Sequence, residues 1–198
     1  MKRGNQILGV FALLIGGASS AHAGFIGTKL SSEYFYPDSE TSYEPAVEAP
    51  PQFFVGDGVE TVVNVEGVTS IAVDVSDTSI LFDFSTTLLN PRWGNVPFNG
   101  LIFNVVNDVP LNFSSFNISS NFEDFDPSRV SFSNSQVTVN WAGLAYDSNT
   151  MLLINFETDA ADVPEPATMT LLGLGFVSAI AMRRRGTKVI KPRQGLNH

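Results

Sequence analysis

The chain has 198 residues, no cysteine and a formal net charge of −9, so it has room for one modest domain with targeting segments but for no disulfide or thiolate chemistry. All 20 acidic residues lie between Glu33 and Glu165, and only three basic residues accompany them within residues 24–165, which leaves that stretch at −17. Such a charge repels phosphate backbones, which argues against nucleic-acid binding and leaves cations, neutral glycans and other proteins as partners.

The first 23 residues have the three parts of a secretory signal helix. Two basic residues open the segment, an apolar run follows at residues 7–15, and small residues lead to Ala21 and Ala23. Small side chains at these two positions suit a signal peptidase, so we predict cleavage before Gly24. A retained N-terminal anchor is the alternative, but the apolar run is shorter than the roughly 20 residues that span a bilayer.

Residues 24–162 are predicted to form an acidic all-β domain. Apolar and polar side chains alternate there in short runs, with turn residues between them. The clearest runs lie at residues 68–75, 80–85, 98–106, 137–142 and 152–157. Eight or nine strands at this spacing predict an antiparallel two-sheet β-sandwich, either jelly-roll or immunoglobulin-like, without fixing the strand order.

Two proline-containing segments interrupt the alternation, at residues 37–51 and 88–97. Both are expected to be surface loops. Trp141 occupies an alternating core position and is expected to be buried. Trp93 lies in the second loop, where it could either cap the sandwich or bind a ligand at the surface.

Histidine is missing from the predicted mature domain, because His22 leaves with the signal and His198 lies near the C-terminus. Without His or Cys, the domain cannot carry Ser-His-Asp or Cys-His nucleophilic catalysis, nor an ordinary zinc, copper or haem site. Carboxylate pairs can hydrolyse glycosides, but 20 acidic residues make some pair inevitable by chance. We therefore expect no catalytic residues and no obligatory cofactor.

One acidic cluster is a candidate calcium site. Glu123, Asp124 and Asp126 lie together in a predicted loop, and calcium takes several oxygen ligands from loops of this kind. The spacing is not that of an EF-hand. The alternative is that the carboxylates face solvent while Phe122 and Phe125 close the end of the sandwich.

Aromatic residues in the two predicted loops are candidates for glycan contact. Tyr36 lies beside the first loop, Tyr43 within it, and Trp93 in the second. Exposed flat rings with nearby polar groups can stack on sugars. An exposed aromatic platform would therefore indicate a carbohydrate-binding module.

The C-terminal segment at residues 163–188 contains three linked features. The first is a stiff polar element, Val163-Pro164-Glu165-Pro166. The second is a short apolar stretch at residues 167–182, which we predict to be a transmembrane helix. The third is a basic cluster, Arg183-Arg184-Arg185. Arginines at the end of a short span can snorkel to the interface. The positive-inside rule places the basic tail, residues 189–198, in the cytoplasm and the acidic domain on the other side.

These three features resemble the PEP-CTERM sorting signal. The resemblance implies recognition by an exosortase, a membrane-embedded protease, which removes the helix near Pro164–Pro166. It also implies a Gram-negative bacterium that makes extracellular polysaccharide, and passage across the inner membrane with transient anchoring there. An ordinary anchor that is never processed is the alternative.

The sequence therefore favours an exported protein without catalytic activity that reaches the cell surface or extracellular matrix. Signal peptidase, exosortase, the inner membrane and extracellular polysaccharide are its expected partners. A carbohydrate- or calcium-binding module is the second hypothesis, and a glycoside hydrolase the third. The middle domain loosely resembles β-sandwich domains that precede such tails, which supports the expected fold and implies no activity.

Overall fold

The computed structural model describes residues 24–158 of the chain. Several predicted features lie outside the described residues: the signal helix at residues 1–23 with Ala21 and Ala23, the sorting segment at 163–188 with its transmembrane helix, and the tail at 189–198. Within residues 24–158, no helix has the length and apolar character that crossing a membrane requires.

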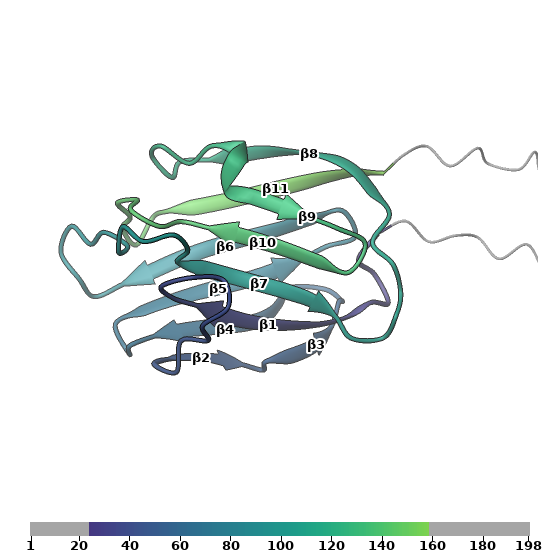
Figure 1. Ribbon diagram of the computed structural model, residues 1–198, viewed down its shortest axis with the longest axis horizontal. Coiled ribbons are helices and arrows are strands. Elements are labelled where there is room, and N and C mark those ends of the chain that lie inside the picture. Colours follow the sequence, from purple (N-terminus) through teal and green to yellow (C-terminus); the bar gives the residue numbers. More distant parts are fainter. Residues whose placement is uncertain (1–23, 159–198) are drawn as a thin grey trace, which may run out of the picture. The chain divides into compact units, whose positions relative to one another are not determined.

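The described residues form eleven strands and one short 3₁₀ helix, η1 (Pro127–Arg129), in two antiparallel sheets (Figure 1). The five-stranded sheet contains, in spatial order, β3 (Gln52–Phe54), β1 (Lys29–Phe35), β7 (Gly100–Val105), β10 (Gln136–Asn140) and β9 (Val130–Phe132). The six-stranded sheet contains β2 (Ala46–Ala49), β4 (Val59–Val65), β5 (Thr69–Val75), β6 (Ser79–Thr86), β11 (Met151–Thr158) and β8 (Phe113–Ser120). The prediction of an all-β domain with two antiparallel sheets is confirmed.

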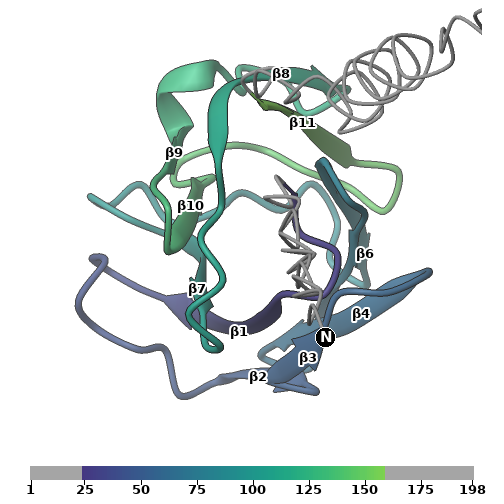
Figure 2. The ribbon, with the colours of Figure 1, turned by 90° about the vertical axis from the view of Figure 1, so that its right-hand side faces the viewer.

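The core lies between the two sheets, which face one another in a sandwich-like arrangement (Figure 2). Alternate residues of β6 point into it: Ile80, Phe82 and Phe84 are fully buried. The ring of Phe82 lies 6.0 Å from Phe103 of β7 and 5.9 Å from Trp141, which follows β10 in the opposite sheet. Each buried Phe contributes about 1.5–3 kcal/mol to folding, so these aromatic contacts help to hold the two sheets together.

The prediction of eight or nine strands was too low, and the segment at residues 37–51 is only partly a loop. Its residues 46–49 form β2, which pairs with β4 through Ala46 and Val65. Pro50 and Pro51 then turn the chain, and β3 continues at the edge of the other sheet. A strand of four residues beside two prolines is too short to show the alternation that predicts longer strands.

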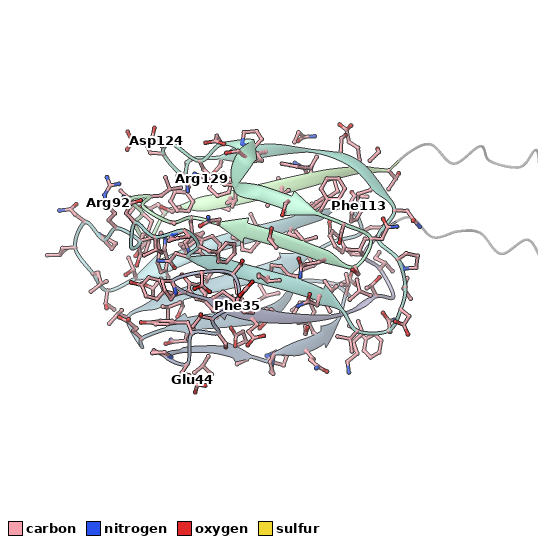
Figure 3. All side chains as sticks on the ribbon, in the orientation of Figure 1. Phe35, Glu44, Arg92, Phe113, Asp124 and Arg129 are labelled. Carbon is pink, nitrogen blue, oxygen red and sulfur yellow. The ribbon has the colours of Figure 1, made fainter. Side chains whose placement is uncertain are left out.

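The two ends of the sandwich differ in the loops and side chains that lie there. The connections after β1, β6 and β10 lie at one end, with Arg92, whereas Phe113 lies at the other (Figure 3). At the second end the rings of Phe25 and Phe156 are 5.4 Å apart, and Phe25 lies 4.7 Å from Phe113. The first described residues therefore pack against the last strand, and the long loops lie at the opposite end.

A substitution at Gly100 tests the close contact between β7 and β10. A Cβ added to Gly100 would lie 1.9 Å from the carbonyl oxygen of Val139, so we expect Gly100→Ala to destabilise the fold by about 3 kcal/mol. Gly56→Ala is the control, because its Cβ would meet nothing within 4 Å, and it should change stability by less than about 0.5 kcal/mol. Urea unfolding measures both, and equal stabilities would contradict this strand packing.

Candidate functional site

Hydrogen-bonded aromatic residues form the floor of one end of the sandwich, where the connections after β1, β6 and β10 lie. This end is called the loop end. The indole N–H of Trp141 donates to the Tyr34 hydroxyl at 2.8 Å, and that hydroxyl donates to Oδ1 of Asn99 at 2.5 Å. All three residues are buried. Burial raises the pKa of Tyr34 well above its usual value, so this phenol stays neutral and keeps its place in the chain of hydrogen bonds.

Trp93 closes the sandwich at this end. Its ring stacks on Tyr146 with centroids 4.4 Å apart and lies 5.8 Å from Trp141. Only 7% of Trp93 is exposed, so it caps the core, and the buried position predicted for Trp141 is confirmed. The Trp93 indole N–H is buried and has no hydrogen-bond partner within the described part of the chain. An unpaired buried N–H is unusual in a protein core.

A pocket of about 270 Å³ opens over this floor. It brings together the three residues predicted to contact glycan, Tyr36, Tyr43 and Trp93, with Tyr34 and Asn99 beneath them. The rings of Tyr36 and Tyr43 lie 5.2 Å apart in an edge-to-face arrangement, and both are half-buried. The pocket therefore offers two partly exposed phenol rings beside a capped tryptophan.

Two charged residues line the pocket along with these rings, and they have opposite signs. The Tyr43 hydroxyl donates to Oε1 of Glu66, and this bond raises the pKa of Tyr43 to about 12. Arg92 donates to the carbonyl of Gly143 and is exposed. Glu66 is the one carboxylate among the described residues that line this pocket. Glycoside hydrolysis generally uses two facing carboxylates, and the described lining of this pocket supplies one.

The residues of the calcium prediction lie in the loop between β8 and η1. Asp126 caps η1 by accepting from the backbone N–H of Ser128 at 2.8 Å and from its hydroxyl at 2.5 Å. The bond from the Ser128 hydroxyl, followed by that from its N–H, lowers the pKa of Asp126. Glu123 and Asp124 are exposed, and Asp124 lies on the outer loops (Figure 3).

The three carboxylates do not converge in the structure. Across residues 24–158, no group of three Asp, Glu, His or Cys side chains is arranged to hold a metal ion. Phe122 is buried, and its ring stacks on Phe125 at 5.7 Å, as the solvent-facing alternative expects. Calcium binding here stays a prediction.

Several residues that line the pocket were not predicted as site residues, among them Asn99, Glu66 and Tyr146. Each of these three lies in a different connection, next to β7, between β4 and β5, and before β11. No spacing in the sequence links them, since only the strand order brings these connections to one end. The prolines and Trp93 were the local signal that marked one of the loops.

Comparisons with known proteins identify the C-terminal segment. The PEP-CTERM protein-sorting motif matches residues 162–185. This range contains the whole of the proline–glutamate–proline element, the apolar stretch and the arginine cluster that the sequence singled out. Comparisons with curated proteins and with solved structures gave no match.

Proposed function

Because the chain carries a PEP-CTERM protein-sorting motif, we propose that it is an exported exosortase substrate whose β domain binds carbohydrate at the cell surface or in the extracellular matrix. The motif implies export and membrane anchoring before processing. The predicted signal peptide supports the same topology, since both segments place the acidic domain outside the cytoplasm.

The pocket at the loop end is the observation that carries the binding proposal. Sugars present flat apolar faces surrounded by hydroxyls, and they are bound by aromatic rings together with a few polar groups. The half-buried rings of Tyr36 and Tyr43 supply the first feature, and Glu66 and Arg92 supply the second. This combination supports carbohydrate binding over a purely structural role.

The size and charge of the pocket limit which ligands it can hold. A volume of about 270 Å³ lies just below the range of roughly 300–1,000 Å³ that is usual for small-molecule sites, so the pocket suits a single sugar unit. Glu66 and Arg92 balance one another in charge. A neutral sugar unit of a longer polysaccharide therefore suits the pocket, and we propose that it is bound without being cleaved.

The position of the domain's ends also supports a binding role. The motif begins at residue 162, shortly after β11 ends at Thr158. That end of β11 lies at the opposite end of the sheets from Arg92 and the loops (Figures 1 and 3). Attachment through the C-terminal side of the domain would thus leave the pocket end unhindered.

Loss of the Tyr36 ring should weaken carbohydrate binding. Affinity electrophoresis in gels containing the neutral polysaccharide fraction of the native cells should show about tenfold weaker retention for Tyr36→Ala, since one stacked ring contributes about 1.4 kcal/mol. Phe54→Ala is the control, because Phe54 is 64% exposed on β3 and lies outside the pocket. Unchanged retention of Tyr36→Ala, or equal losses in both variants, would contradict the proposed site.

The sorting proposal predicts defined ends for the exported protein. Mass spectrometry of the surface and extracellular fractions of native cells should find a chain that begins at Gly24 and lacks the residues after Pro166. A Pro164→Ala, Pro166→Ala double variant should keep its C-terminal segment and stay in the membrane fraction, whereas Pro110→Ala should be processed normally. Full-length C-termini on the wild-type surface protein would count against exosortase processing.

A further inference from the structure

A second groove lies at the edge of β1 next to the aromatic pocket, between the end of the β3 pairing and the bridge from Phe35 to Ser42. It has a volume of about 640 Å³, and Tyr34 and Tyr43 line both sites. The groove begins where β3 leaves β1, because β3 pairs only with Lys29, Leu30 and Ser31. β1, β2 and β3 lie together on this side of the molecule (Figure 2), and Glu44 projects beside β2 (Figure 3).

The groove exists because proline interrupts the strand pairing. The N–H of Ser32 donates to the carbonyl of Pro51 at 3.0 Å. Paired residues in an antiparallel ladder normally exchange two such bonds, but Pro51 has no N–H to donate back to the Ser32 carbonyl. The next N–H along this edge, that of Tyr34, donates to Oε1 of Glu48 at 2.8 Å instead of to a strand. A carboxylate therefore fills a position that a neighbouring strand would occupy.

The groove carries negative charge that no basic side chain in its described lining neutralises, although Glu48 accepts the Tyr34 N–H. Glu33, Glu44 and Glu48 line it, and no Lys or Arg is among its described lining residues. Glu48 is half-buried, and burial raises its pKa. Ser32 is only 3% exposed, lines the groove, and its hydroxyl has no hydrogen-bond partner in the described range. An unneutralised carboxylate and an unpaired buried hydroxyl are costly unless something binds them.

We propose that this groove binds the protonated amine of an amino sugar, adjoining the sugar held in the aromatic pocket. The inference rests on the proposed carbohydrate function for the identity of the carrier molecule. An ammonium group supplies three hydrogen-bond donors and a positive charge. The groove offers acceptors in different directions, namely the carboxylates of Glu48 and Glu44 and the carbonyl of Ser32. Tyr43 lines both sites and so connects the groove to the aromatic pocket.

The arrangement favours an amine over a metal ion. A divalent cation needs several carboxylate oxygens around one point, and within residues 24–158 no three acidic side chains are gathered in that way. An ammonium needs only hydrogen-bond acceptors in different directions. The continuity with an aromatic pocket favours a sugar as its carrier, because sugar rings stack on tyrosine.

Three β-1,4-linked pentamers of equal length test the proposal by calorimetry with the exported protein. They are the pentamers of glucosamine, N-acetylglucosamine and glucose, compared at mildly acidic pH where the free amine is protonated. The glucosamine pentamer should bind about tenfold more tightly than the two neutral pentamers, and added salt should reduce this preference. Glu48→Gln combined with Glu44→Gln should remove the preference and leave neutral binding unchanged.

The control is Glu123→Gln combined with Asp124→Asn, which removes two charges, as the test variant does, from exposed positions outside the groove. Thermal melts of every variant check that the fold is intact, and the Glu48→Gln side chain would keep an oxygen to accept from the Tyr34 N–H. A glucosamine preference that persists in the double variant, or is absent in the wild type, overturns the proposal. So does calcium binding that requires Glu48 and excludes the glucosamine pentamer.

The two proposals fail in different ways. If the neutral pentamers bind and Tyr36→Ala weakens them, but no amine preference exists, only the amine subsite is wrong. If the glucosamine pentamer alone binds, through Glu48 and independently of Tyr36, the neutral-sugar pocket is wrong and the amine site stands.

Discussion

The hydrogen bonds from Trp141 to Tyr34 and from Tyr34 to Asn99 are the constraint on which the loop end depends. They connect the end of β1, the start of β7 and the end of β10, so three neighbouring strands must meet in one register. Polar tips of buried aromatic residues generally have partners, and those of Trp141 and Tyr34 find theirs in another buried residue. The result is a rigid floor on which Trp93 and Tyr146 stack. The pocket above it is shaped by packing, although its walls come from loops.

The two prolines beside the edge of β1 have two structural consequences. Pro50 and Pro51 turn the chain from one sheet to the other and so close this side of the sandwich. The same prolines end the pairing of β3 with β1, because proline cannot donate to the ladder. Glu48 then completes the edge with its carboxylate. Closing the sandwich and opening an acidic groove are therefore consequences of the same turn.

Much of the fold could be predicted from the sequence, and the limits have physical causes. Long alternating runs such as Ser79–Thr86 reveal their buried face, since every second side chain meets the core. The sorting motif could also be predicted from the sequence, because its residues are contiguous in the chain and need no tertiary structure to be identified. The short strands β2 and β3 were not, since three or four residues show no period. The pocket combines positions 34, 43, 66, 93 and 146, and only the strand order brings those separate connections together.

The central claim is that the exported domain binds sugar over the Trp93 cap, and the two tryptophans of the chain allow a direct measurement. Proton–nitrogen NMR spectra of the ¹⁵N-labelled protein resolve one indole N–H signal from each. On titration with the neutral polysaccharide fraction of the native cells, the signal of Trp93 should shift, because Trp93 lines the pocket that the sugar enters. The signal of Trp141 should stay nearly constant, because its N–H is already bonded to Tyr34. Shifts confined to the opposite end, around Phe25, Phe113 and Phe156, or no shift at saturating ligand, would contradict the account.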